Sequence, residues 1–154
     1  MLYLLVLLLG LAIDQLTKWL IMSNLPLNGG FDVIFGLLRI HYVQNTGAAW
    51  SMFSENTLAL AVFSLFVLVL LGVWFYKTPQ AEIGQRLSLV VIMSGALGNM
   101  IDRFRLGYVV DFIQLPHWPV FNVADMLLCC GVAGLAFLLL KDEFKPKSEE
   151  AGHE

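Results

Sequence analysis

The stretch TLALAVFSLFVLVLLGVWFY, residues 57–76, contains no charged side chain. A helix needs about 20 apolar residues to cross about 30 Å of hydrocarbon, so this stretch is long enough to span a membrane. The whole chain agrees, because 58% of its 154 residues are hydrophobic and only 14% are charged. Soluble domains carry about 25% charged residues. The sequence therefore predicts an integral membrane protein.

Three further segments are apolar and long enough to cross a membrane, although each carries polar residues toward one end. We predict transmembrane helices at about 2–21, 57–76, 87–103 and 121–140. The first segment could be a secretory signal, but Asp14 and Lys18 stand where such a signal has its apolar core and cleavage site. We therefore keep it as a helix. The predicted fold is an all-α membrane protein with four transmembrane helices.

The predicted connections on the outer side are a loop at 23–56 and a loop at 104–120. The first contains FDVIFGLLRIHYVQ, residues 31–44, which is rich in β-branched and aromatic residues and favours short strands. The second contains Pro116 and Pro119, which would interrupt a helix. We expect one integral membrane domain over 1–154, with a small β-containing extracytoplasmic loop region and a disordered cytoplasmic tail at 141–154.

The basic residues predict the orientation of the chain. Five lie on the side of the two termini, and three lie on the opposite side: Lys77, Arg86, Lys141, Lys145 and Lys147 against Arg39, Arg103 and Arg105. Because cytoplasmic loops carry an excess of Lys and Arg, this bias favours cytoplasmic termini.

Several classes of function lack support in the composition. The net charge is −3, and the nine Lys and Arg residues form no basic stripe of the kind that nucleic-acid binding requires. Cys129 and Cys130 are adjacent in an apolar helix and cannot form an ordinary disulfide. His41 and His117 have no second ligand at metal-binding spacing. We expect no nucleic-acid partner, no metal and no cofactor.

Helix geometry converts sequence distance into depth in the membrane. Lys141 and Arg86 should both mark the inner surface, and each lies sixteen residues from an acid, Asp125 and Asp102 respectively. At 1.5 Å per residue, both acids lie about 24 Å above that surface. This level is just inside the outer edge of the hydrocarbon, where an ionisable group is costly unless it faces the protein interior or water.

Other polar residues reach the same level. In the first helix Asp14 lies at about 20 Å and Lys18 at about 25 Å. Asp111 lies in the second outer loop and Asn45 lies in the polar turn QNTG of the first, so both can fold back to that depth. The grouping of these side chains predicts a functional site.

Each of these residues also has a purely structural interpretation. Asp14 and Lys18 are four residues apart on one helix face and predict an ion pair. Asn122 and Asp125 have the spacing of a variant capping box at the start of the fourth helix. Asn45 fits a turn. The coincidence of these polar groups at one depth favours a shared role.

Carboxylates are the strongest chemical groups at this level, because the sequence has no GxSxG, HExxH or glycine-rich phosphate loop. Two carboxylates held close together do not both ionise readily, so one keeps a proton while the other activates water. Asp111 and Asp125 are the predicted pair, because both have apolar neighbours on each side.

Five motifs in order carry a resemblance to a known family. They are DQLTK at 14–18, NTGAAWSMF at 45–53, GNMIDR at 98–103, VVDF at 109–112 and FNVAD at 121–125. This set resembles that of the bacterial lipoprotein signal peptidases, also called signal peptidase II. The motifs span nearly the whole chain apart from the tail. Departures are small, such as Trp50 where the family often has Phe.

The resemblance implies an aspartyl endopeptidase that removes the signal peptide from diacylglyceryl-modified prolipoproteins, cutting before the lipidated cysteine. It also implies a monomer in the bacterial cytoplasmic (inner) membrane with its active site on the extracytoplasmic side. The catalytic residues would be Asp111 and Asp125. The substrate-binding residues would be Asn45, Gly98, Asn99, Arg103 and Asn122, supported by Asp14, Lys18 and Asp102.

Two other classes of function remain open at this point. A small proton-coupled transporter would also carry acids within the membrane, and an assembly subunit would use polar residues to join helices. Transporters tend to place polar groups at the midplane and to contain repeats, and the sequence shows neither feature.

Overall fold

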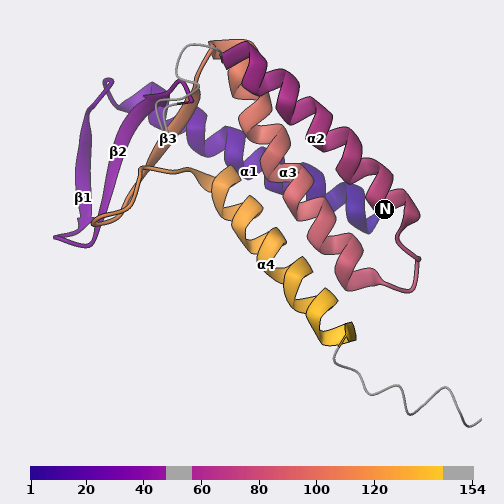
Figure 1. Ribbon diagram of the computed structural model, residues 1–154. Helices are drawn as coiled ribbons and strands as arrows, with labels where there is room; N and C mark the ends of the chain where they lie inside the picture. Colours follow the sequence, from indigo (N-terminus) through magenta and orange to yellow (C-terminus); the bar gives the residue numbers. More distant parts are fainter. Residues whose placement is uncertain (48–56, 144–154) are drawn as a thin grey trace, which may run out of the picture.

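The structure is a computed structural model of the chain and describes residues 1–47 and 57–143, with side chains described as far as residue 141. Four helices pack together in a bundle, and a small sheet lies at one end of it (Figure 1). The helices are α1 (Leu2–Asn24), α2 (Thr57–Lys77), α3 (Ile83–Leu106) and α4 (Val123–Glu143). The strands are β1 (Gly30–Ile34), β2 (Leu38–Asn45) and β3 (Val109–Gln114). The predicted fold class is confirmed.

Each of the four helices is long and apolar enough to cross a membrane. Their outer faces carry exposed large hydrophobic side chains, such as Phe63, Phe66 and Phe137, and these suit contact with lipid. Helix α3 packs against each of the other three helices. Its glycines allow close approach, because a Cβ at Gly95 would overlap the main chain at Ala124 of α4.

Helix α1 extends beyond its expected end at residue 21. Its last turn continues to Asn24, because the Ser23 hydroxyl and the Asn24 amide donate hydrogen bonds to carbonyl oxygens one turn earlier. Helix α3 is longer than 87–103 at both ends. It ends at Leu106, and Gly107 follows as a left-handed cap with a φ of 79° and an N–H that donates to the Arg103 carbonyl.

Helix α4 begins at Val123, two residues later than expected. The difference arises because Phe121 forms an antiparallel bridge with Ile113 and so belongs to the edge of the sheet. At the other end α4 continues to Glu143. The rest of the expected tail, 144–154, lies outside the described residues, as does Trp50.

The sheet is antiparallel in the order β1-β2-β3. Strands β1 and β2 confirm the short strands that composition favoured in the first outer loop, whereas β3 was not expected in the second. Asn45 pairs with Val109, and Val43 pairs with Asp111. Because residues two apart along a strand share a face, Asn45 and Asp111 are diagonal neighbours on one face of the sheet. The pairing of β2 with β3 therefore brings the two outer loops together.

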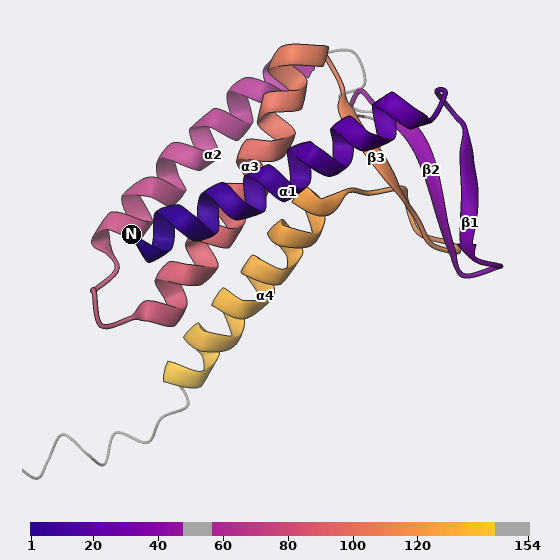
Figure 2. The same cartoon turned by 180° about the vertical axis from the view of Figure 1, so that it is seen from behind.

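The sheet lies at the end of the helix bundle where α1 ends and α4 begins, and the start of α1 lies at the opposite end (Figure 2). Strand β3 follows α3 closely in the chain, and residues 115–122 then connect β3 to α4. The first residues of α4 are thus placed beside the sheet.

Candidate active site

Asp125 lies in the first turn of α4, where it forms a reciprocal cap with Asn122. The Asp125 N–H donates to Asn122 Oδ1 at 3.0 Å, and the Asn122 N–H donates to Asp125 Oδ2 at 3.1 Å. This arrangement confirms the predicted capping box. It fixes the Asp125 carboxylate at the helix start, with its second oxygen available to other partners.

Asp111 lies in β3 and is only 2% exposed. Asn45 Nδ2 donates to its Oδ2 at 2.9 Å, and Asn122 Nδ2 donates to its Oδ1 at 2.6 Å. Burial raises the pKa of the Asp111 carboxyl to about 6, with a further rise from the charge of Asp125, although the two amide donors and Lys18 act in the opposite direction. Asp111 therefore keeps a proton at pH values where an exposed aspartate is ionised.

Two asparagines connect the acids. Asn122 is fully buried, bonds Asp111 through its side chain and bonds Asp125 through its main chain. Asn99 donates through Nδ2 to Asp125 Oδ1 at 2.8 Å, and its Oδ1 accepts from Asn122 Nδ2 at 3.1 Å. Because Asn99 Oδ1 accepts, its amide must direct the donor nitrogen at Asp125. The acids from β3 and α4 thus belong to one hydrogen-bonded network.

Beneath this network lies a buried group of three charges. Lys18 Nζ is 2.9 Å from Asp14 Oδ2 and 2.9 Å from Asp102 Oδ2, which confirms the predicted Asp14–Lys18 pair and adds a second acid. Lys18 also donates to Asn99 Oδ1 at 2.9 Å. Asp14 accepts from the Ala124 N–H at 2.9 Å, and Asp102 accepts from the Val110 N–H at 3.1 Å.

This lower group ties the candidate acids to the membrane helices. Ala124 immediately precedes Asp125, and Val110 immediately precedes Asp111. The carboxylates of α1 and α3 therefore hold the main chain next to each acid. Gln15, which sequence analysis did not select, donates to Asp102 Oδ1 at 3.0 Å and to the Gly98 carbonyl at 3.2 Å. Only its place inside the DQLTK motif signalled it.

The two acids share a cavity of about 480 Å³. Its lining residues come from β2, α3, β3, the segment 115–122 and the start of α4: Val43, Gln44, Asn45, Arg103, Asp111, Trp118, Pro119, Val120, Phe121 and Asp125. A second cavity of about 260 Å³ lies between α2, α3 and α4 and is lined by Phe63, Ser64, Val67, Ala96, Asn99, Arg103, Asp125 and Leu128. Arg103 and Asp125 border both cavities. A ligand can thus contact both acids from the sheet side, and Asp125 from the helix side as well.

Arg103 is the cation that lines both cavities together with Asp125. Within 1–47 and 57–143, its Nε is buried and has no hydrogen-bond partner. A guanidinium at a cavity wall, with this N–H available, is suited to bind carbonyl or phosphate oxygens.

The chemistry of the site agrees with a match between residues 6–141 and a family described as signal peptidase (SPase) II. The chain belongs to the signal peptidase II family. Membership makes it a membrane peptidase of the aspartic class. It confirms the resemblance drawn from the five motifs and removes the support for a transporter or an assembly subunit.

Relatives from the signal peptidase II family match this chain along most of their length. The chain is 44% identical to the lipoprotein signal peptidase of Moorella thermoacetica, covering 90% of this chain and 92% of that protein. It is 43% identical to the lipoprotein signal peptidase of Geobacter sulfurreducens, covering 87% and 88%. A bacterial membrane enzyme structure at 2.3 Å resolution superposes with a TM-score of 0.88 at 31% identity, covering 99% of this chain and 93% of that one.

The residues that resemblance assigned to substrate binding fall into two groups in this signal peptidase II chain. Asn45, Asn99 and Arg103 line the cavities. Asn122 is fully buried beneath them, and Gly98 faces Asp14, whose carboxylate a Cβ at this position would overlap. Asn122 thus bonds both acids, whereas Gly98 leaves the space that the Asp14 carboxylate occupies.

The described part of the chain offers no metal centre. In residues 1–47 and 57–143 no group of three or more His, Cys, Asp or Glu side chains is arranged to hold a metal ion. The functional groups that line the two cavities include the carboxylates of Asp111 and Asp125, side-chain amides and the Arg103 guanidinium.

Proposed function

We propose that the protein is an aspartic endopeptidase of the bacterial cytoplasmic membrane that removes the signal peptide from diacylglyceryl-modified prolipoproteins, cutting before the lipidated cysteine. The names of its relatives support the substrate class. The observation that carries the proposal is the pair Asp111 and Asp125, joined through Asn122 and facing one cavity.

Asp111 and Asp125 act as the catalytic dyad, sharing one proton. The ionised carboxylate removes a proton from water as the water oxygen attacks the scissile carbonyl carbon, and the protonated carboxyl donates its proton to the carbonyl oxygen. When the tetrahedral intermediate collapses, the C–N bond breaks and a proton passes to the leaving amine. The raised pKa of Asp111 supports its role as the group that holds the shared proton.

Asn45, Asn99 and Arg103 bind the substrate around the dyad. The larger cavity takes the peptide segment that carries the scissile bond, and the smaller cavity between the helices takes apolar groups. The guanidinium of Arg103, at the border of both cavities, donates to a backbone carbonyl or a lipid oxygen and thereby sets the register of the cut.

The depth of the dyad explains a requirement for lipid. A soluble peptide would have to leave water to reach acids near the outer edge of the hydrocarbon, whereas a diacylglyceryl group holds the substrate there with about 0.8 kcal/mol per buried methylene. The termini lie in the cytoplasm and the site lies on the extracytoplasmic side. The enzyme acts as a monomer, without a cofactor or a nucleic-acid partner.

The decisive experiment compares one prolipoprotein with and without its diacylglyceryl group, using purified enzyme in detergent. We expect cleavage of the lipidated form alone, and we expect Asp111→Asn to cleave neither. Equal cleavage of both forms by the unaltered enzyme would contradict lipid-dependent recognition while leaving the dyad intact. Cleavage by the Asp111→Asn protein would instead contradict the dyad.

A further inference from the structure

The turn of the β1–β2 hairpin and the segment after β3 expose a group of large apolar side chains. We call Val33, Ile34, Phe35, Leu37 and Trp118 the hairpin-tip surface. Phe35 is 92% exposed and Trp118 is 65% exposed, and the other three are each more than half exposed. These side chains lie outside the cavity that holds the two acids, except for Trp118, which borders it. The proposed function leaves the rest of the surface without a role.

An apolar surface of this kind is unfavourable in water. Exposed hydrophobic patches normally mark contacts with other molecules. Strand β1 enlarges the exposed apolar surface. It is an edge strand, and all of its residues after Gly30 are exposed, so both faces of the strand are open. Unprotected apolar edge strands promote association unless they are covered.

The placement of the hairpin indicates that lipid covers it. In both views the turn of the hairpin points to the same side as the end of α4, from the outer end of the helix bundle toward the inner end (Figure 1 and Figure 2). The turn is therefore directed back toward the bilayer. The membrane helices also expose large apolar side chains along their length, so the hairpin-tip surface extends a lipid contact that the helices already make.

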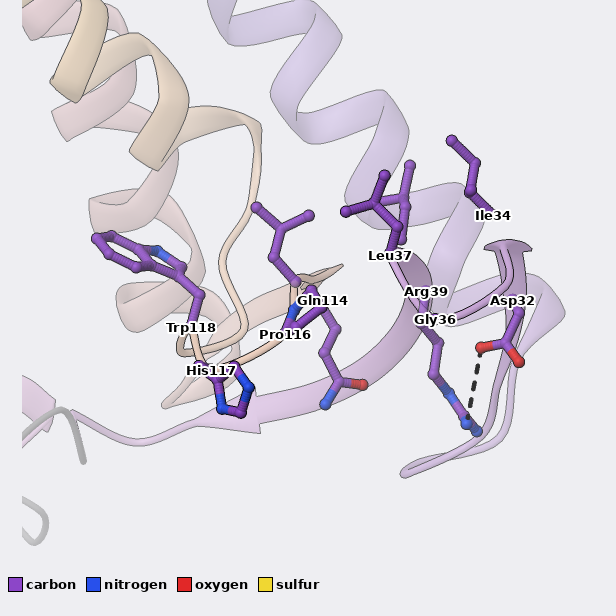
Figure 3. A pocket seen from close by; sticks show the side chains of 11 residues that line it. Asp32, Ile34, Gly36, Leu37, Arg39, Gln114, Pro116, His117 and Trp118 are labelled. Carbon is purple, nitrogen blue, oxygen red and sulfur yellow. Dashed lines mark ion pairs between the residues drawn. The ribbon is translucent and has the colours of Figure 1, made fainter.

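A hollow of about 350 Å³ beside this surface supplies polar groups at the right place. Figure 3 shows Ile34 and Leu37 from the hairpin, Trp118 and His117 from the segment after β3, and Arg39 of β2 beside Asp32. The Arg39 guanidinium is 4.0 Å from Asp32, at the outer limit for an ion pair, and both side chains are nearly half exposed. Its N–H groups therefore remain accessible to a phosphate oxygen.

We propose that the hairpin-tip surface inserts into the outer headgroup region of the bilayer, with Arg39 contacting a lipid phosphate. Apolar and aromatic residues beside a basic group are typical of elements that lie in the membrane interface, and tryptophan prefers that region. The partner is the phospholipid of the bilayer itself.

This contact would act on the proposed active site, on which this step of the inference rests. Strand β2 begins beside the hairpin turn and ends at Asn45, which bonds Asp111. Lipid contact at one end of the strand thus fixes the sheet, and with it Asp111, relative to Asp125 on the membrane helix α4.

The depth of the hairpin is measured with an environment-sensitive fluorophore on Phe35→Cys, in full-length protein whose exposed Cys129 and Cys130 are replaced by serine. Ser23→Cys, at the outer end of α1, is the matched control. In phosphatidylethanolamine–phosphatidylglycerol vesicles, we expect lipid-borne doxyl groups to quench the Phe35 label several-fold more strongly than the Ser23 label. Aqueous iodide should show the reverse order. No turnover is needed, so this result is independent of the proposed function.

Two outcomes overturn the inference. Iodide quenching at position 35 as strong as at position 23 would place the hairpin in water. Weak quenching by both agents would show that protein covers it, either a second copy or another segment. The functional consequence is tested with Phe35→Ser/Leu37→Ser, which should lower turnover of a lipidated prolipoprotein in vesicles several-fold and leave turnover in detergent unchanged. An equal loss in both media would assign the effect to folding and overturn the role of lipid contact.

Discussion

At the scale of single residues, Asn122 controls the geometry of both acids. Its side chain bonds Asp111, and its main chain and side-chain oxygen complete the cap with Asp125. A shift of this one residue therefore moves one acid relative to the other. Because the acids belong to different elements, their separation depends on this connection as much as on either element.

Replacing either acid with its amide should abolish turnover. Asp111→Asn and Asp125→Asn keep the side-chain shape but remove the exchangeable proton, and acid–base groups of this kind contribute about 10²–10⁴-fold to rate. The measurement is a single-turnover rate with lipidated substrate, alongside thermal unfolding to show that the fold is retained. Glu82→Gln, an exposed acid at the start of α3, is the control and should behave as the unaltered enzyme. A near-normal rate in either active-site variant would remove that acid from the dyad.

The pH dependence of kcat/KM should report the proton on Asp111. Burial raises the pKa of this carboxyl to about 6, so the protonated form is lost as pH rises through 6, and kcat/KM should fall over that range. The Asn45 amide stabilises the ionised form, so Asn45→Ala should raise the pKa of Asp111 and move the falling limb to higher pH.

The control for this shift is Gln44→Ala. Gln44 lines the same cavity but donates to the Tyr42 hydroxyl instead of to an acid. Its replacement should leave the position of the limb unchanged. If the fall of kcat/KM with pH occurs over the same pH range in the Asn45→Ala variant as in the unaltered enzyme, the titrating group is not Asp111.

Much of this residue-scale picture could be predicted from sequence. Spacing identified the Asn122–Asp125 cap and the Asp14–Lys18 pair, because both are contacts within a few residues of one helix. The contacts of Asp14 with Ala124 and of Asp102 with Val110 could not be predicted. They join a side chain to a main-chain N–H on another element. Nearly every residue has such an N–H, so the sequence does not indicate which one is bound.

At the scale of elements, the three buried charges on α1 and α3 hold these two helices of the bundle together. Lys18 faces two carboxylates, and all three side chains are almost fully buried. Breaking a buried pair leaves an uncompensated charge, whereas removing both partners is milder. The stabilising role of this group thus depends on Lys18 more than on either acid.

Lys18→Met should lower the stability of the protein by about 3–5 kcal/mol, because it leaves two buried carboxylates without a cation. Asp14→Leu combined with Lys18→Met should be milder, since only Asp102 then lacks its partner. Thermal unfolding in detergent measures both, with Lys77→Met at the exposed end of α2 as the control. Strictly additive losses in this double-mutant cycle would contradict the coupling.

Gly98→Ala should destabilise the contact between α1 and α3. The added Cβ would overlap Asp14 Oδ2, the same oxygen that Lys18 binds, and overpacking of this kind costs about 1–3 kcal/mol. Gly72→Ala in α2 is the matched control, because nothing lies within 4 Å of a Cβ there. Unfolding temperatures should fall for the first variant and stay level or rise for the second. Equal changes would show that helix propensity alone is responsible.

The helices themselves could be predicted from hydropathy, but their ends could not be placed. The start of α4 depends on the bridge between Phe121 and Ile113, which is a contact of the sheet. Strand β3 was missed because VVDFIQ lies between two membrane segments, and its partner strand is more than sixty residues earlier in the chain.

At the scale of the whole molecule, four spans bring the start of α1 and the end of α4 to the same side of the membrane. Reporter fusions at Asn28 and at Glu149 should therefore report opposite sides, with the Glu149 reporter in the cytoplasm, as the excess of basic residues predicts. Fusion after Pro79, between α2 and α3, should agree with Glu149 and is the internal control. A shared side for Asn28 and Glu149 would contradict the arrangement of four spans.

The link between Asp14 and Ala124 spans 110 residues and has a consequence for biosynthesis. Helix α1 leaves the ribosome long before α3 and α4 exist, and it must enter the bilayer with Asp14 and Lys18 neutralising each other alone. Asp102 joins this pair only when α3 arrives, and the first turn of α4 joins last. The newly made chain therefore has no assembled acid pair during most of its synthesis, and proteolytic activity begins only after its last helix has been inserted.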